Sequence, residues 1–215
     1  MNKNNHLLLS LMLYSIASLN INYVSGKALA FEANYNLGRS TILLNESVYP
    51  IRSQPNSIFG ISGGSISETN LYIRFCFNIS SINTIRNESA IGISLKYFQF
   101  APQIGKLFNK NRTGILIGPY LSLLINKSIS SSDPYLASFI INSFHDYDFG
   151  LTLNIKQLIY KINNTDIGIN SGVTYGLSNI YDPQIYPLGG WSTGNKRAQN
   201  FYLFIGFYLN LVNDK

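Results

Sequence analysis

The stretch that decides the fold is residues 200–210, NFYLFIGFYLN, near the end of the chain. Its residues alternate between two sets, and the first set consists of Phe201, Leu203, Ile205, Phe207 and Leu209. The second set includes Tyr202, Gly206 and Tyr208. Because successive side chains of a strand point to opposite faces, this period of two predicts an extended strand. A tilted strand needs roughly 9–11 residues to cross a bilayer, and this uncharged stretch has about that length. We expect the first set to face lipid and the second to face the interior of a barrel.

Seven earlier segments repeat this period and are predicted to be strands. They are residues 29–38, 57–65, 71–80, 89–100, 113–126, 146–159 and 166–180. Eight strands are an even number and close the smallest common membrane barrel. We therefore predict an all-β fold, an eight-stranded antiparallel up-and-down transmembrane β-barrel. The last strand should pair with the first near residues 31–37 and leave no free edge.

Two prolines affect the predicted fourth and fifth strands. Pro102 is expected to follow the fourth strand, because proline cannot donate to a ladder. Pro119 lies inside the fifth strand, where we expect a kink or a bulge.

The predicted connections alternate in length along most of the chain. Long connections at residues 39–56, 127–145 and 181–199 alternate with short turns, and only the connection after the third strand breaks the rule. Outer-membrane barrels place long loops outside and short turns in the periplasm. The alternation therefore predicts that both chain ends lie in the periplasm.

The composition separates a membrane barrel from a soluble β-sandwich, which is the alternative fold. Charged residues make up 12% of the chain, against about 25% in soluble proteins. A sandwich exposes its polar faces to water, so charges should be frequent there. Here those faces consist mainly of Gly, Ser, Thr, Asn and Tyr, which favours the narrow interior of a barrel.

A few charges do fall on the face predicted to line the lumen. They are Glu32, Arg74, Lys96, Asp148 and Lys156. An unpaired buried charge is costly. We therefore expect these five side chains to form a charge network inside the barrel.

The first 26 residues resemble a secretory signal peptide, and residues 27–215 are expected to form the barrel domain. Residues 7–19 are an apolar core too short to span a membrane comfortably. Cleavage is expected after Gly26, with Ala30 as the second choice, and a retained anchor helix is the alternative. Beyond this region no apolar run reaches the length of a spanning helix, so a membrane location requires a closed barrel.

The chain offers little for catalysis or metal binding. It has one cysteine, Cys76, and two histidines, His6 and His145, far apart in the sequence. No metal or cofactor is therefore expected. An enzyme is not expected, because residues 60–64, GISGG, fit Gly-x-Ser-x-Gly but lie in a predicted strand and not in a strand-to-helix elbow. His145 with Asp146 or Asp148 is the remote candidate for a catalytic group.

The expected partner is outer-membrane lipid, with another envelope or secretion protein as a further candidate. The net charge is +6, but the cations are scattered, so no nucleic-acid partner is expected. In the last predicted loop, Tyr181, Tyr186 and Trp191 are candidates either for contacting a protein partner or for lying at the headgroup boundary. The chain is expected to be a monomer.

Three short motifs occur in the order found in one family of membrane barrels. They are HDYDFGL at residues 145–151, GVTYGLSNI at 172–180 and GILIGPYL at 114–121. Over about residues 85–209 the chain thus resembles the PorT-like outer-membrane β-barrel family of Bacteroidota, whose members are often described only as porin-like. The resemblance implies an outer-membrane barrel without catalytic residues. The founding member of that family is associated with type IX secretion and gliding.

Taken together, these patterns predict a bacterial outer-membrane protein. We expect a structural, binding or secretion-accessory role through the loops at residues 39–56, 127–145 and 181–199. The alternative is a narrow porin-like channel for small solutes. The remote alternative is an outer-membrane enzyme.

Overall fold

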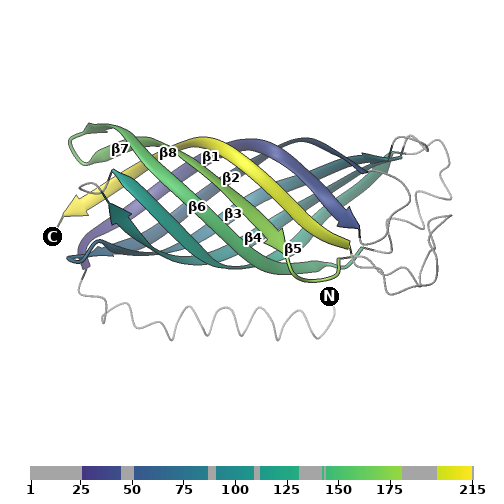
Figure 1. The fold of residues 1–215 in the computed structure, drawn as a ribbon, viewed down its shortest axis with the longest axis horizontal. Coiled ribbons are helices and arrows are strands. Elements are labelled where there is room, and N and C mark those ends of the chain that lie inside the picture. The colour runs from purple at the N-terminus through teal and green to yellow at the C-terminus, as the bar shows by residue number, and fades with distance from the viewer. Residues whose placement is uncertain are drawn as a thin grey trace.

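The structure is a computed structural model and describes residues 26–44, 51–86, 91–108, 112–130, 142, 144–180 and 198–214. The strands are β1 Gly26–Leu44, β2 Ile51–Ser67, β3 Leu71–Arg86, β4 Ile91–Phe108, β5 Thr113–Ser130, β6 Tyr147–Ile162, β7 Thr165–Gly176 and β8 Ala198–Asp214. Each strand pairs antiparallel with the next, and the sheet closes into a barrel (Figure 1). The predicted eight-stranded up-and-down barrel is confirmed.

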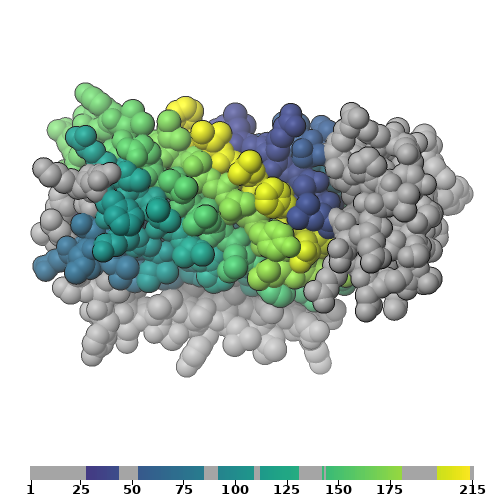
Figure 2. Space-filling model, in the orientation of Figure 1, coloured from purple at the N-terminus to yellow at the C-terminus, as the bar shows by residue number. Residues whose placement is uncertain are grey.

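The closing pair of strands is β1 and β8. Their pairing runs without a register shift from Ala28 opposite Asp214 to Leu44 opposite Ala198. At its centre Tyr35 lies opposite Phe207, as the sequence predicts for the region of residues 31–37. Figure 2 shows β8 in yellow between β7 in green and β1 in purple. The sheet therefore has no free edge.

Side chains alternate between the outer surface and the lumen along the strands. On β8, Phe207 is 68% exposed whereas its neighbour Tyr208 is 6% exposed. On β1, Phe31 is exposed and Glu32 is buried. The outward and inward directions predicted for the two faces of β8 are therefore confirmed. A soluble sandwich is excluded because it would consist of two separate sheets.

The predicted loop at residues 39–56 is mostly strand, so this prediction is wrong. β1 continues to Leu44 and β2 begins at Ile51. The small polar residues of this stretch suggested a loop, but they fill the lumen: the Asn56 amide donates to the buried Ser40 hydroxyl. Pro55 pairs with Arg39 on the β1 side, but on the β3 side no pairing occurs between Ser53 and Ile58, so its missing N–H interrupts no ladder with β3.

The end of β4 was also predicted wrongly, because the strand continues through Pro102 to Phe108. Pro102 pairs with Phe75 on the β3 side. On the β5 side, Phe100 pairs with Leu121 and Ile104 with Ile117, and the described ladder has no pairing between them. This register places Pro102 opposite Pro119, so two residues without N–H groups share one gap in the ladder.

The bulge expected at Pro119 occurs elsewhere. The register of β4 and β5 is the same before and after the two prolines. It shifts between Lys96 and Tyr97, opposite Asn126 and Leu124, so the extra residue belongs to β5 and is Ile125. The shift thus lies towards the loop-bearing end of the strands.

Two of the short turns depend on asparagine. Asn70, between β2 and β3, has φ of 62°, and Asn163, between β6 and β7, has φ of 49°. Asparagine tolerates this left-handed conformation better than most residues. Among the described residues, no helix is long and apolar enough to cross a membrane.

The closing pair generates the first prediction. A Cβ atom at Gly206 would meet the Tyr35 backbone oxygen and the Asn36 side chain. We expect Gly206→Ala to lower the free energy of unfolding by about 1–3 kcal/mol, the usual cost of overpacking. Urea titration of the protein in lipid vesicles measures this change.

The matched control is Gly63→Ala on β2. A Cβ atom there would meet only the Phe31 ring, at 3.6 Å. Its stability should stay within about 0.5 kcal/mol of the wild type. Equal losses for both variants would contradict the close β1–β8 contact.

Candidate functional site

The barrel has two different ends. We call the end that carries the β2–β3 and β6–β7 turns and the last residues of β8 the turn end, which lies at the left of Figure 1. The opposite end, where β1, β3, β5 and β7 finish, is the loop end. Between these ends the lumen is the candidate site, because the buried polar and charged side chains of the described strands point into it.

The centre of the charge network is the carboxylate of Glu32 on β1. One of its oxygens accepts a hydrogen bond from Arg74 Nη1 on β3 at 2.8 Å. The other oxygen pairs with the ammonium group of Lys156 on β6. All three side chains are nearly fully buried, so the ion pairs cross the inside of the barrel between three separate strands.

Neutral groups complete the surroundings of the two cations. Arg74 Nε donates to Gln103 Oε1 on β4 at 2.9 Å. Lys156 Nζ lies 4.0 Å from the centroid of the Tyr208 ring and 5.5 Å from that of Tyr72. Ring faces attract cations. They therefore help to balance a group of one carboxylate and two cations, which carries one excess positive charge.

Lys96 does not belong to this network, and its predicted position in the lumen is wrong. Its side chain is exposed, whereas its neighbours Leu95 and Tyr97 are 0% and 1% exposed. Period two separates the faces of a strand without stating which face is inside. Leu95 and Tyr97 looked like lipid-facing residues because they are apolar or aromatic, but they pack inside the lumen.

Asp148 is inside the lumen, in a separate group near the loop end. Its carboxylate accepts hydrogen bonds from Tyr120 Oη at 2.8 Å, Asn200 Nδ2 at 2.8 Å and Ser178 Oγ at 2.5 Å. Asp148 and Lys156 are eight residues apart on β6, which is about 26 Å along a strand. The structure therefore brings Glu32, Arg74 and Lys156 together and leaves Asp148 with neutral donors.

An apolar cluster lies in the lumen at the loop end, and it was not predicted from the sequence. Its buried members are Ile42, Ile82, Leu95, Tyr97, Phe144, Ile180 and Ala198. Phe144 and Ile180 come from beyond the strand ends, where His145 N donates to Ile180 O and Ile180 N donates to Ala198 O, both at 2.9 Å. The signal in the sequence is the apolar face of β4.

In the middle of the lumen, the described residues line two small cavities. One cavity of about 20 Å³ lies beside Tyr97 and Asp148. Another of about 20 Å³ lies beside Arg74 and Gln99. A water molecule needs at least about 10–15 Å³ by this measure, so each cavity holds roughly one water.

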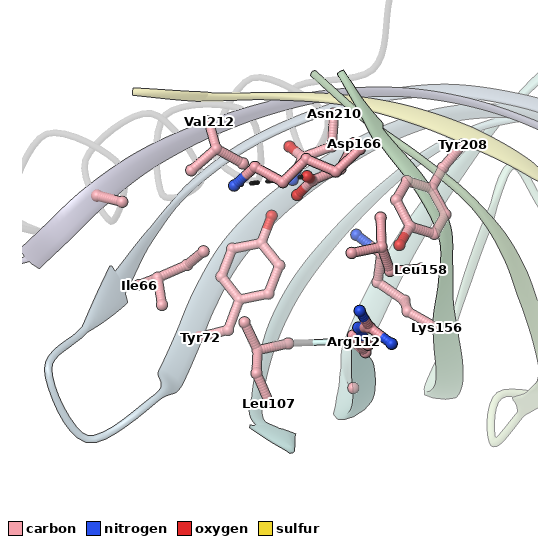
Figure 3. Close-up of a pocket in the computed structure, with 13 residues that line it drawn as sticks. Ile66, Tyr72, Leu107, Arg112, Lys156, Leu158, Asp166, Tyr208, Asn210 and Val212 are labelled. Atoms are coloured by element: carbon pink, nitrogen blue, oxygen red, sulfur yellow. Dashed lines mark ion pairs between the residues drawn. The ribbon is translucent and has the colours of Figure 1, made fainter. Parts of the chain in front are cut away.

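A larger cavity of about 250 Å³ lies at the turn end (Figure 3). Its lining includes Tyr72, Arg112, Lys156 and Tyr208. Lys156 therefore contributes both to the charge network and to the floor of this cavity. The space is thus distributed unevenly, with a wide turn end and a packed centre.

The remaining predicted residues are those of the remote catalytic candidate and of the last loop. The Asp148 carboxylate accepts hydrogen bonds from Tyr120, Ser178 and Asn200. His145 is half-buried, and the centroid of its ring lies 6.1 Å from that of Tyr147. Within the described ranges no group of His, Cys, Asp and Glu could hold a metal ion. The loop candidates lie outside the described residues; they are Tyr181, Tyr186 and Trp191.

The comparisons found similar structures but no similar family. No protein-family model matches the chain. No curated protein matches it either.

Several solved structures are similar to the chain, each at low identity. Neisserial surface protein A is 12% identical, with a TM-score of 0.46, covering 85% of this chain and 97% of that protein. The attachment invasion locus protein Ail of Yersinia pestis is 11% identical, with a TM-score of 0.44, covering 85% and 99%. The outer membrane protein OprG from Pseudomonas aeruginosa is 7% identical, with a TM-score of 0.44, covering 86% and 96%.

The charge network generates the second prediction. Glu32→Gln leaves Arg74 and Lys156 buried without their shared anion. We expect this variant to lose about 3–5 kcal/mol of the free energy of unfolding, as is usual when one partner of a buried pair is removed. Urea titration in lipid vesicles measures the loss.

Lys96→Gln is the control, because it removes an exposed charge from β4, the strand next to the Arg74 strand β3. It should change stability by less than about 0.5 kcal/mol. If Glu32→Gln and the control have the same free energy of unfolding, the charge network does not stabilise the barrel.

Proposed function

We propose that this chain is a bacterial outer-membrane barrel that does not conduct solutes and acts through its loops. The role is structural, binding or secretion-accessory, with no catalytic step. The filled lumen is the observation that carries the proposal. The apolar cluster, the Asp148 group and the charge network follow one another along it, with cavities of about 20 Å³ between them.

The outer surface supports the membrane location. Large apolar side chains are exposed on many strands, and they include Phe31, Leu37, Phe59, Ile61, Ile115, Ile117, Phe149, Leu151, Leu203, Ile205 and Phe207. A soluble monomer rarely exposes an apolar patch of more than a few hundred Å². Lipid is the partner that covers such a band on every side.

We assign the turn end to the periplasm and the loop end to the outside. Outer-membrane barrels carry short turns in the periplasm and long loops outside. The connections that end at Tyr147 and Ala198 are the long ones, whereas the one between β1 and β2 is short. We therefore transfer the proposed contact role to residues 131–141 and 181–197, which include Tyr181, Tyr186 and Trp191. The signal peptide at residues 1–26 is part of the same proposal.

The narrow porin-like channel remains the alternative function. The turn-end cavity favours it, because that cavity leaves a space of about 250 Å³ at one end of the barrel. The apolar cluster at the loop end opposes it. The resemblance to the PorT-like family of Bacteroidota, with a role in secretion, stays a prediction.

The membrane location generates the third prediction. Ile205 lies in the middle of β8 and Leu211 lies near its turn end, and both are exposed. An Arg at the bilayer midplane of a barrel costs about 2–4 kcal/mol, and near the interface about 0–1 kcal/mol. We therefore expect Ile205→Arg to destabilise the protein in vesicles by about 2 kcal/mol or more, and Leu211→Arg by less than about 1 kcal/mol.

The same two variants test the soluble alternative. On a water-exposed surface both substitutions should stay within about 0.5 kcal/mol of the wild type. Equal and small effects in vesicles would contradict a membrane-spanning β8.

The filled lumen generates the fourth prediction. In planar bilayers the purified protein should show no steady conductance. A steady conductance that changes with Lys156→Gln, but not with the control Lys96→Gln, would favour the channel. Lys156 lies inside the lumen and Lys96 on the outer surface, so only a current through the barrel distinguishes them.

A further inference from the structure

The turn-end cavity has features that the proposed loop function does not use. It is lined by residues of all eight strands, from Ala28 on β1 to Val212 on β8, so it lies on the barrel axis. Its volume of about 250 Å³ is close to the lower limit of small-molecule pockets, about 300 Å³. The cavity is therefore large enough for a small organic molecule.

The charges of the cavity are mostly positive. Arg112, Lys156 and Lys161 line it, against one carboxylate, that of Asp166. Lys161 Nζ lies 4.0 Å from Asp166 Oδ1, and Lys156 is paired with Glu32 below the floor. Arg112 has no ion pair with any residue in the described part of the chain. Arg112 is exposed, so the cavity has at its rim a guanidinium group that no described carboxylate pairs with.

A second observation comes from buried polar atoms. The Tyr72 hydroxyl and Asn210 Oδ1 are buried without a hydrogen-bond partner among the described residues. Tyr72 is 1% exposed, and its hydroxyl points towards the Asn210 side of the cavity in Figure 3. A buried polar group without a partner costs about 1–3 kcal/mol. A molecule in the cavity that accepts a hydrogen bond from Tyr72 would remove this cost.

The remaining wall of the cavity is apolar. It is formed by Ala28, Ile66, Leu107, Leu158 and Val212. Figure 3 shows Ile66, Leu107 and Val212 on the same side as Tyr72, with Arg112 and Lys156 farther along the cavity. A bare inorganic anion would leave this wall without a contact, so the arrangement fits a molecule with both an anionic and an apolar part.

We propose that the turn-end cavity is a binding site for a small organic oxyanion. A phosphate or carboxylate group accepts hydrogen bonds from Arg112 and Tyr72, and the apolar part packs on Ile66, Leu107 and Val212. A guanidinium group is suited to either oxyanion through paired N–H donors. The oxyanion comes either from a free small molecule or from a lipid headgroup, and the experiment separates these sources.

The test is isothermal titration calorimetry of the full chain, refolded in a non-ionic detergent, with phenyl phosphate as the probe. We expect binding of one phenyl phosphate per barrel. Arg112→Gln and Tyr72→Phe should each weaken it about tenfold, the effect of losing one hydrogen bond to a charged group. Lys96→Gln is the matched control and should bind like the wild type. Migration of unboiled protein on gels shows that each variant is folded.

Inorganic phosphate should bind more weakly than phenyl phosphate, because it makes no contact with the apolar wall.

A repeat titration in nanodiscs of phosphatidylglycerol separates the two sources of the oxyanion. Loss of phenyl phosphate binding in these nanodiscs assigns the site to a lipid headgroup, and unchanged binding assigns it to a free small molecule. The proposal is overturned by the absence of binding at millimolar phenyl phosphate, or by binding that Arg112→Gln and Tyr72→Phe leave unchanged. These outcomes do not depend on conductance or on the loops, so they leave the proposed function intact.

Discussion

The structure depends on the requirement that every strand has a hydrogen-bonded neighbour on both sides. In lipid no water is present to pair with free backbone groups, and a sheet can meet this requirement only by closing. The continuous pairing of β1 with β8 achieves closure over the whole of β8 and all but the first two residues of β1. Gly206 at the centre of this pair allows a backbone approach that a larger residue would prevent.

Closure creates a narrow interior, and the contents of that interior follow from it. Charges placed there must be paired, so Glu32 joins Arg74 and Lys156 across three strands. Asp148 instead receives three neutral donors. The loop end is filled by apolar side chains and the turn end keeps a cavity, so the two ends of one barrel have different chemistry.

The sequence predicted the strand number and the closing pair because period two survives over eight segments. The position of Lys96 was not predictable from that pattern, since alternation separates two faces without saying which one is inside. The length of the β1–β2 loop was overestimated, because residue types such as Ser40 and Asn56 are common in loops and are equally suited to a narrow lumen. The gap at Pro102 depends on Pro119 lying opposite, which is a fact of register between strands. Residues from all eight strands line the turn-end cavity, so no local sequence pattern could predict it.

Hydrogen–deuterium exchange of the protein in lipid vesicles tests closure most directly. Amide groups of residues 31–37 and 205–211 should exchange as slowly as those in the centre of β6, because each lies within a continuous antiparallel ladder. Exchange of β1 and β8 amides that is faster than that of β6 by orders of magnitude would show an open edge, and would contradict the closed barrel.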